Sequence, residues 1–409
     1  MKDWNSFRRI EAAFNREIPD RVPKYEGTIE IPDLNPIIRG QEDHGTVFLF
    51  SPQHIDLFHK NPLFFSAIKK SVEKGKTKGI KRIIPDPESI SKIHRDYNYD
   101  MFGYIAGIPM VLKDQFFNDF YGDENGKVIR GPGGRLVFRI SPDGAHTRHG
   151  FFRTPEDWEK YIDLNGEHPG NFFLVEDTMK ICEDLDIVPI FSVFGCGFFE
   201  ELCGIFGFEA LFKLLVKNKN FIKSVVKDMS EYSLVVAEKI LENGGKFIYM
   251  TCDLGYKGRS IISPRMFREF FKPGITKFCE RVHELGGYVL IHSCGYIMEL
   301  LPDIIETSVD AIHPIEKAAG NDIVEIKNKY GKKITIVGNV PIPLLTHGSP
   351  DENYDYVKYL LENVSKGGGH ILSSSHSVTQ WCKLENFKAY NKATEDLGKY
   401  PINIKEVFK

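Results

Sequence analysis

The sequence predicts an α/β protein folded as a (β/α)8 TIM barrel. Short apolar runs alternate with amphipathic helical patterns, above all after residue 185, and eight candidate strands can be counted along the chain. Polar side chains also follow the ends of several of these strands, which is where barrel enzymes place their catalytic groups. A doubly wound parallel sheet is the alternative architecture for the same alternation.

The predicted strands are short apolar runs of six to ten residues. Two of them, VPKYEG (22–27) and the weaker YIAGIPMVL (104–112), lie in the first third of the chain. The other six are DIVPIFSVFG (186–195), KFIYMT (246–251), GYVLIHS (287–293), VDAIHP (309–314), KITIVGN (333–339) and GHILSSS (369–375).

Amphipathic segments between these strands predict helices. They cover residues 208–218, 219–243, 263–286 and 351–368. The last two begin with Ser or Asp and end in Gly, which are residues that cap the two ends of a helix.

Residues 30–150 follow the strand–helix pattern poorly. Within them, YGDENGKVIRGPGGRLVFRISPDG (121–144) contains the Asn-Gly and Gly-Gly pairs that are typical of a β-hairpin. We interpret residues 1–409 as a single barrel domain in which residues 30–150 form an irregular cap, with a β-hairpin, over the barrel mouth.

Composition and charge exclude several classes of protein. With 53 basic and 56 acidic residues, the chain has neither the charge nor a basic stripe that would predict nucleic-acid binding. Its seven cysteines form no Cys-x-x-Cys pair, which favours a reducing cytoplasm over a secreted disulfide scaffold. The charged N-terminus does not resemble a signal peptide, and no apolar stretch is long enough for a membrane span. A homodimer is compatible with the sequence.

The segment GYVLIHSCGYI (287–297) ends its apolar run with a histidine and a cysteine two positions apart. Because side chains alternate along a strand, His292 and Cys294 are expected on one side of its C-terminal end. An imidazole and a thiolate in this arrangement can bind one metal ion, and the pair favours zinc. The alternative is that Cys294 is an ordinary buried cysteine.

Two other strand ends supply further candidate residues. GHILSSSHSV ends with His376, and Asp253 follows KFIYMT on the strand's inward face. Since a catalytic zinc takes three protein ligands, His292, Cys294 and His376 are predicted to bind it. Asp253 is the predicted catalytic residue, as a fourth ligand, a hydrogen-bonding neighbour or a proton-handling group. The alternatives are a hydrogen-bonded loop histidine at His376 and a helix cap at Asp253.

Four residues are predicted to bind substrate. Phe198 and Glu201 belong to FGCGFFEELCGIFGFE (194–209), which either packs phenylalanines onto the core or forms an apolar wall with a polar contact. Tyr256 follows the strand end at residues 246–251. His313 ends another strand, although the neighbouring proline is equally consistent with a structural turn.

Several stretches together resemble the uroporphyrinogen decarboxylase superfamily, specifically its zinc-dependent, corrinoid-linked methyltransferase branch. The resemblance is strongest over residues 186–401 and weak over residues 30–150. The stretches that carry it are PDRVP (19–23), TCDLGYKGRSIISPRMFREFFKP (251–273), LIHSCGYIMELLPDIIETSVDAIHPIEKAAGNDI (290–323), KYGKKITIVGNVPIPLL (329–345), GGGHILSSSHSV (367–378) and ENFKAYNKATEDLGKYP (385–401).

The resemblance implies a (β/α)8 barrel with its active site at the C-terminal mouth of the strands. In the methyltransferase branch a His-x-Cys-Gly motif supplies two zinc ligands, which match His292 and Cys294 here. The third ligand comes from the last strand and is commonly a cysteine in enzymes that activate a small thiol. This chain has His376 there, which argues against thiol activation and for a different methyl transfer.

The decarboxylases of the superfamily carry an N-terminal arginine-rich glycine motif that binds the porphyrinogen carboxylates. PDRVPKYEG offers only Arg21 at this place. The resemblance therefore implies methyltransferase I of an O-demethylase-type system, which moves a methyl group from a small methoxylated donor, either aromatic or non-aromatic, to the Co(I) corrinoid of a partner protein. The alternatives are transfer from a methyl-corrinoid to a thiol or folate, a uroporphyrinogen-type decarboxylase, and a metal-free binding barrel.

Overall fold

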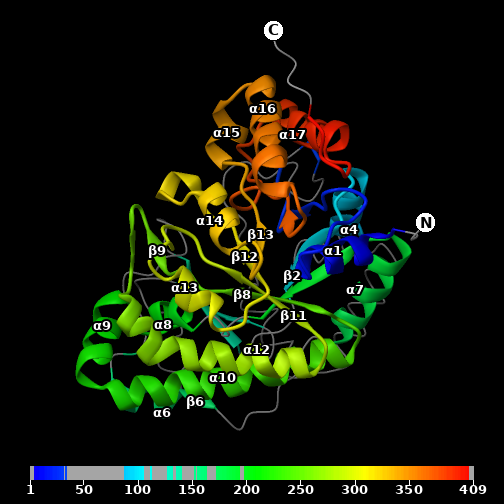
Figure 1. Cartoon of the computed structure of the whole chain (residues 1–409). Coiled ribbons are helices and arrows are strands. Elements are labelled where there is room, and N and C mark those ends of the chain that lie inside the picture. The colour runs from blue at the N-terminus through cyan, green and yellow to red at the C-terminus, as the bar shows by residue number, and fades with distance from the viewer. Residues whose placement is uncertain are drawn as a thin grey trace.

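The computed structural model describes residues 4–31, 33–34, 87–105, 111–112, 127–131, 135–140, 152, 154–163, 172–193 and 198–404. Eight parallel strands form one sheet, and its first and last strands meet to close a barrel (Figure 1). In sheet order the strands are β1 (Tyr25–Glu26), β2 (Met101–Ile105), β7 (Val188–Ser192), β8 (Phe247–Thr251), β11 (Tyr288–His292), β12 (Ala311–His313), β13 (Thr335–Val337) and β14 (His370–Ile371).

The seam between β14 and β1 is a parallel bridge between Lys24 and Leu372. The Tyr25 backbone N–H donates to the Leu372 carbonyl over 3.0 Å, and the Leu372 N–H donates to the Pro23 carbonyl over 2.9 Å. The predicted (β/α)8 barrel is therefore confirmed, because a doubly wound sheet has no such seam.

Seven of the eight predicted strands contain the observed strand, and one prediction is displaced. The strand expected at residues 104–112 begins at Met101 and pairs with β7 as far as Ile105. Val111–Leu112 is instead β3, which pairs antiparallel with β6 (Ile162–Asp163). The sequence pattern concealed the true start because a charged residue, Asp100, directly precedes the strand and is itself buried.

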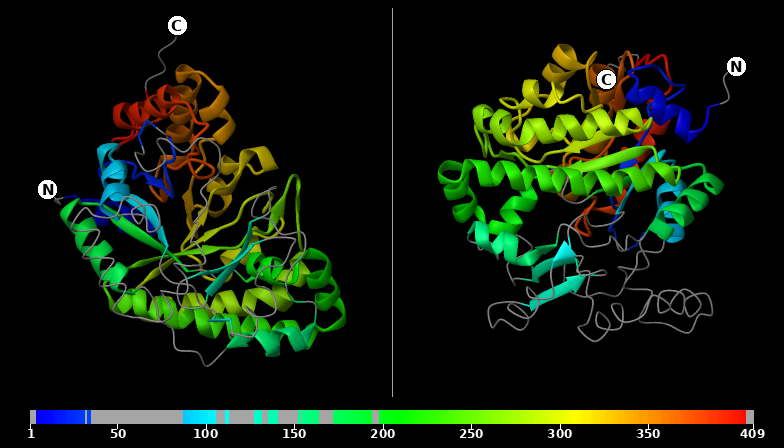
Figure 2. Two further views of the ribbon diagram at one scale, coloured as in Figure 1. Left: turned by 180° about the vertical axis from the view of Figure 1, so that it is seen from behind. Right: turned by 90° about the horizontal axis from the view of Figure 1, so that it is seen from below.

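Helices surround the barrel in the alternating order that the sequence predicts. The long helices α10 (Lys219–Glu242) and α12 (Lys272–Glu284) pack side by side, as do α16 (Pro350–Leu360) and α17 (Leu384–Leu397) (Figures 1 and 2). Ser263 is a cap as predicted, since its hydroxyl accepts from the Met266 N–H over 3.2 Å at the start of α11 (Pro264–Met266). The cap of α16 is Ser349 and not the predicted Asp351, and the Ser349 hydroxyl accepts from the Glu352 N–H over 3.2 Å. Among the described helices, none has the length and apolar character that a membrane span requires.

The predicted β-hairpin is present outside the barrel. Strands β4 (Lys127–Gly131) and β5 (Arg135–Ile140) pair antiparallel, with Lys127 opposite Ile140. Figure 2 shows this ribbon apart from the eight-stranded sheet. Most of residues 30–150 lie outside the described residues, so a cap over the mouth and a single domain for the whole chain stay predictions.

Apolar side chains from successive strands fill the barrel at the end where the strands begin. Helix α1 (Ser6–Phe14) closes this end, because its Phe14 ring packs 4.9 Å from the ring of Phe247 and 5.4 Å from that of Tyr288, at the starts of β8 and β11. The buried residues of this cluster are Ile10, Ala13, Phe14, Tyr25, Met101, Val188, Ile190, Phe247, Leu290, Ala311, Val337 and Ile371. The opposite end, where the strands finish, is left for polar groups.

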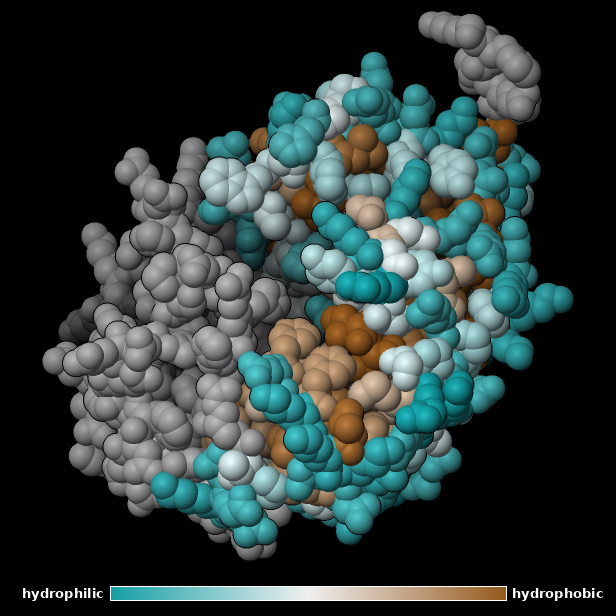
Figure 3. Space-filling model, turned by 90° about the vertical axis from the view of Figure 1, so that its left-hand side faces the viewer, coloured by the Kyte–Doolittle hydropathy of each residue, from teal (hydrophilic) through white to brown (hydrophobic). Residues whose placement is uncertain are grey.

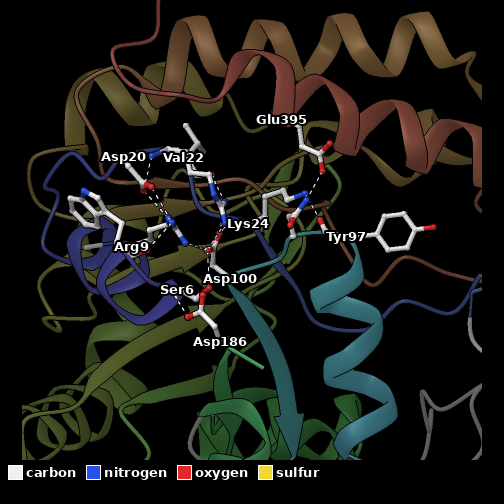
Figure 4. Close-up of polar contacts among 12 residues, drawn as sticks. Ser6, Arg9, Asp20, Val22, Lys24, Tyr97, Asp100, Asp186 and Glu395 are labelled. Carbon is white, nitrogen blue, oxygen red and sulfur yellow. Dashed lines mark hydrogen bonds and ion pairs between the residues drawn. The ribbon is translucent and has the colours of Figure 1, made fainter. Parts of the chain in front are cut away.

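A buried carboxylate fastens the N-terminal segment to the same end of the barrel (Figure 4). Both oxygens of Asp100 accept from the Arg21 guanidinium over 2.7 Å. Asp100 also accepts from the Ser6 hydroxyl and the Lys24 backbone N–H, each over 3.1 Å, and it pairs with Arg9 over 3.4 Å. Since Asp100 directly precedes β2, these contacts connect α1 and the start of β1 to the neighbouring strand.

Candidate metal centre

Strand β11 carries His292 to the C-terminal mouth of the barrel, on the inward face. The register pairs His292 with Thr251 of β8 on one side and with His313 of β12 on the other. Leu290, two residues earlier, belongs to the barrel interior, so the alternation expected of a strand places His292 directly above that apolar layer. His292 is 9% exposed, so its side chain is nearly buried.

Three potential metal ligands lie together at this mouth. One nitrogen, sulfur or oxygen atom from each of His292, Cys294 and Asp253 lies within 4.8 Å of the other two. The His292 Nε2 atom is 3.2 Å from the Cys294 Sγ atom and 3.6 Å from the Asp253 Oδ1 atom. The structure therefore brings together both members of the His-x-Cys motif and the carboxylate predicted from the end of β8.

A hydrogen bond and two glycines hold the loops after β8 and β11 close together. The Cys294 backbone N–H donates to Asp253 Oδ1 over 2.8 Å, and the Gly255 N–H donates to the Cys294 carbonyl over 3.2 Å. A Cβ atom at Gly295, whose φ is +79°, would lie 2.2 Å from the Gly255 carbonyl carbon. The glycine that ends the His-x-Cys-Gly motif is thus required by this close approach.

His313 lies behind His292 and contacts it directly. The two Nδ1 atoms are 2.7 Å apart, and the Nε2 atom of His313 is 3.3 Å from the Ser374 carbonyl oxygen. A carbonyl can only accept, so a neutral His313 carries its proton on Nε2 and accepts at Nδ1 from His292. This arrangement leaves the Nε2 atom of His292 unprotonated, with its lone pair toward Cys294 and Asp253.

The electrostatics of the centre favour a cation. Burial lowers the pKa of His292 to about 4, so the imidazole is neutral and can act as a ligand. Burial also raises the pKa of the Cys294 thiol, and the nearby carboxylates of Asp253, Glu316 and Glu200 raise it further. A divalent cation reverses that effect because it stabilises the thiolate that binds it.

A pair of acidic residues lies beside the centre on α8 (Phe199–Phe206). Burial raises the pKa of Glu200 to about 8, and the charges of Asp253 and Glu201 raise it further. The structure therefore places Glu200 next to Asp253, and Glu201 next to Glu200. Substrate contact by Glu201 stays a prediction, as does that of Phe198, whose ring is fully buried and packs against Gly274 of α12.

The remaining predicted site residues lie around the mouth. Tyr256, on the short strand β9 (Gly255–Tyr256), is 63% exposed, and its carbonyl accepts from the Tyr296 N–H over 2.9 Å. His313 is 4% exposed with both ring nitrogens engaged, so its described contacts are with His292 and Ser374. Substrate binding by these two residues also stays a prediction.

His376 lies close to the centre but outside the compact group of three. Its ring centroid is 6.4 Å from that of His292, and the residue is exposed. It lines a cavity of about 210 Å³ at the ends of β12, β13 and β14. The other residues that line this cavity are Glu316, Lys317, Ala318, Pro341, Ile342, Pro343 and Ser375. The role of His376 as the third ligand stays a prediction, and Asp253 is the residue already within reach.

Apolar surface also lies on the side of the molecule that carries α9 (Phe208–Lys217) (Figure 3). Phe208 and Val216 of this helix are 45% and 68% exposed. Together with Phe212 they border a shallow depression whose charged neighbours include Lys213 and Lys217.

Comparison with known proteins assigns the chain to a family. The profile of the uroporphyrinogen decarboxylase (URO-D) family matches residues 139–397, which is more than half of the chain. The chain belongs to this family. A uroporphyrinogen decarboxylase from Shewanella loihica is 26% identical over 77 residues, which are 19% of this chain and only 22% of that relative.

The fold of this URO-D family member extends over nearly the whole of a solved relative. A methyltransferase from Methanosarcina mazei superposes with a TM-score of 0.61 at 17% sequence identity. The match covers 96% of this chain and 99% of the relative. At this identity the likeness establishes a shared fold, in agreement with the barrel described above.

Sequence reasoning missed three contacts of the centre. These are the contact of His313 with His292, the hydrogen bond from Cys294 to Asp253, and the hydrogen bond from the Gly295 N–H to Glu316 over 3.1 Å. A signal for the first was available, since both histidines end neighbouring predicted strands. The other two depend on loop conformations that carry no sequence pattern.

Proposed function

We propose that this URO-D family protein is a zinc-dependent methyltransferase that moves a methyl group from a small methoxylated compound to the Co(I) corrinoid of a partner protein. The observation that carries the proposal is the compact group of His292, Cys294 and Asp253 at the mouth of the barrel. The shared fold with the Methanosarcina mazei methyltransferase supports the reaction class. The His-x-Cys-Gly motif supports the methyltransferase branch over the decarboxylases.

The donor atoms of the group fit zinc. One imidazole nitrogen, one sulfur and one carboxylate oxygen are ligands that zinc accepts in a tetrahedral site with an open position. His376 is the alternative to Asp253 as third ligand, and it is near enough to contribute a fourth contact if its exposed side chain turns. The neutral His292 and the carboxylates around Cys294 suit a site built for a divalent cation.

Methyl transfer from an ether is difficult because the departing oxygen is a poor leaving group. Zinc, when bound, supplies the positive charge that stabilises this oxygen. The protein residues would act around it: His292 and Cys294 hold the ion, and Asp253 either completes the ligand set or holds a proton near the departing oxygen. The Cys294 N–H bond fixes Asp253 Oδ1 for this role.

A cavity at one side of the mouth supports a small donor. The cavity beside His376 has a volume of about 210 Å³, and its walls combine apolar groups such as Pro341 and Ile342 with polar groups. An aromatic methoxy compound is proposed from the phenylalanine-rich sequence after β7, although Phe198, Phe199 and Phe206 themselves are buried in the core. The corrinoid partner would approach the same mouth, because the methyl donor must lie between the metal and the acceptor.

Metal content tests the centre. We expect about one zinc per chain in the wild type and a large loss in His292→Ala and in Cys294→Ala, since each removes a ligand of a three-ligand site. Zinc is measured by elemental analysis of folded protein after dialysis. His347→Ala and Cys182→Ala are matched controls that remove a histidine and a cysteine from other parts of the fold. Wild-type zinc in both site variants would overturn the assignment.

A donor panel tests the reaction. Purified protein is mixed with Co(I) cobalamin and with methoxyarenes, methanol or methylamines, and methylation of cobalt is followed by visible absorption. We expect transfer from a methoxylated compound, and a decrease of about 100-fold or more in Asp253→Asn because a positioned acid–base group contributes at least about two orders of magnitude. Absence of transfer from every donor would contradict the proposal and make decarboxylation the next reaction to assay.

A further inference from the structure

Glu26 is a buried glutamic acid that lies between the barrel and α17, and burial raises its pKa to about 8. It lies on β1, is 1% exposed, and is within hydrogen-bond distance of three protein groups. Its Oε1 atom accepts from the Ser374 backbone N–H over 2.8 Å and from the Tyr390 hydroxyl over 3.0 Å. Its Oε2 atom is 2.6 Å from the Ser374 hydroxyl. Burying a carboxyl group costs free energy unless its hydrogen bonds are satisfied. The residue that these hydrogen bonds hold in place indicates the role of Glu26.

Glu26 binds Ser374, and Ser374 connects the segment after β14 to the histidines of the metal centre. The Ser374 carbonyl faces His313 Nε2 over 3.3 Å, and the Ser374 hydroxyl also contacts the His376 carbonyl. Ser374 is thus bound on one side by Glu26 and on the other by the two histidine-bearing segments. Within the described part of the chain, the hydrogen bonds of Glu26 go to Ser374 and Tyr390 and not to His292, His313 or His376.

The Ser374 carbonyl affects His292 through the histidine that lies between them, His313. As an acceptor it selects the His313 tautomer with the proton on Nε2, and His313 Nδ1 then accepts from His292 Nδ1 over 2.7 Å. The lone pair of His292 Nε2 is thereby directed toward Cys294 Sγ, 3.2 Å away. Groups that orient a ligating histidine in this way commonly change metal affinity 10- to 100-fold when they are removed.

We propose that Glu26 is a positioning residue of the metal centre: it fixes Ser374, and through the Ser374 carbonyl and His313 it fixes the ring orientation and tautomer of His292. The inference rests on the proposed metal site and adds to it a residue on the first strand of the barrel. Glu26 itself contacts no ligand atom. It affects His292 only through Ser374 and His313, which lie between them.

Co²⁺ binding tests this role, because its visible absorption reports the geometry of the ligands as well as the affinity. We expect Glu26→Ala to fold, to bind Co²⁺ at least about tenfold more weakly, and to change the absorption bands. Glu26→Gln, which keeps an acceptor for the Ser374 N–H, should restore most of the affinity. Ser374→Ala removes the hydroxyl but keeps the carbonyl, so it should have a smaller effect of the same kind.

The matched control is Asp303→Asn. Asp303 is a similarly buried carboxylate, 6% exposed, but its ion pairs are with Arg268 over 2.7 Å and Lys272 over 3.0 Å on the outer helices. We expect this variant to lower the Tm and leave Co²⁺ affinity and absorption unchanged. Such a pattern separates a positioning role from a general loss of stability.

Two results would overturn proposals at different levels. If Glu26→Ala and Ser374→Ala bind Co²⁺ with the affinity and absorption of the wild type, the positioning role of Glu26 is wrong and the metal site stands. If Glu26→Ala does not fold, Ser374→Ala alone decides the question. If the wild type binds no Co²⁺, the proposed metal site itself is wrong.

Discussion

The protonation of His292 is set by atoms that lie outside its own strand. Its neighbour His313 ends β12, and the carbonyl that selects the tautomer of His313 belongs to Ser374 after β14. The sequence alone could predict that His292 and Cys294 lie on the same side, because side chains alternate along a strand. They could not predict which nitrogen is free, because that depends on a contact between segments 61 residues apart in the sequence.

Another buried histidine, His370, predicts how the stability of the protein depends on pH. His370 on β14 is 1% exposed, and its nitrogens contact the Ser365 hydroxyl over 2.7 Å and the Gly338 carbonyl over 2.8 Å. Burial lowers its pKa to about 3. Between the unfolded pKa near 6.5 and this value the unfolded state binds one more proton, so the free energy of unfolding is expected to fall by about 1.4 kcal/mol per pH unit as the pH decreases.

Urea unfolding of the wild type and His370→Gln at several pH values between 7 and 4.5 checks this expectation. Glutamine cannot titrate, so the variant lacks the contribution of His370 and the stability difference between the two proteins should shrink as the pH falls. The other buried histidines contribute equally to both proteins and cancel in the comparison. A stability difference that does not change with pH would contradict the neutral state of His370.

At the scale of elements, strands and helices were predictable where local pattern and burial agree. The helix expected at residues 351–368 begins at its Ser349 cap, since the capping box satisfies backbone groups that would otherwise lack partners. The predicted strand was displaced from the position of β2 because a charged residue such as Asp100 usually lies at the surface. Only its contacts with Arg21 and the N-terminal segment, which no local pattern contains, explain why it is buried before a strand.

The same contacts predict a large effect of a small substitution. We expect Asp100→Asn to lower the free energy of unfolding by about 3 kcal/mol, because it leaves the charge of Arg21 without its partner inside the structure. Urea unfolding measures the change. Glu209→Gln, which breaks an exposed pair with Lys213 at 2.6 Å on α9, is the control and should leave stability unchanged within error. Equal effects of the two substitutions would contradict the structural role of Asp100.

At the scale of the whole molecule, the barrel could be predicted because eight apolar runs alternate with helices, and parallel strands bring their C-terminal ends to one mouth. That rule alone also placed Asp253 near His292 and Cys294, which the structure brings within 4.8 Å of one another. The contribution of Glu26 could not be predicted in this way. It depends on β1 and β14 being neighbours, and that neighbourhood exists only once the sheet is closed.

The seam between Pro23–Tyr25 and Leu372 links segments about 350 residues apart, so this protein has a long-range contact at the point where its ring is completed. During synthesis on the ribosome the first strand must wait, with one edge unpaired, until the last strand has emerged. The hydrogen bonds from Ser374 to Glu26 form at this same junction. The orientation of the histidines would then be among the last features acquired by the nascent chain.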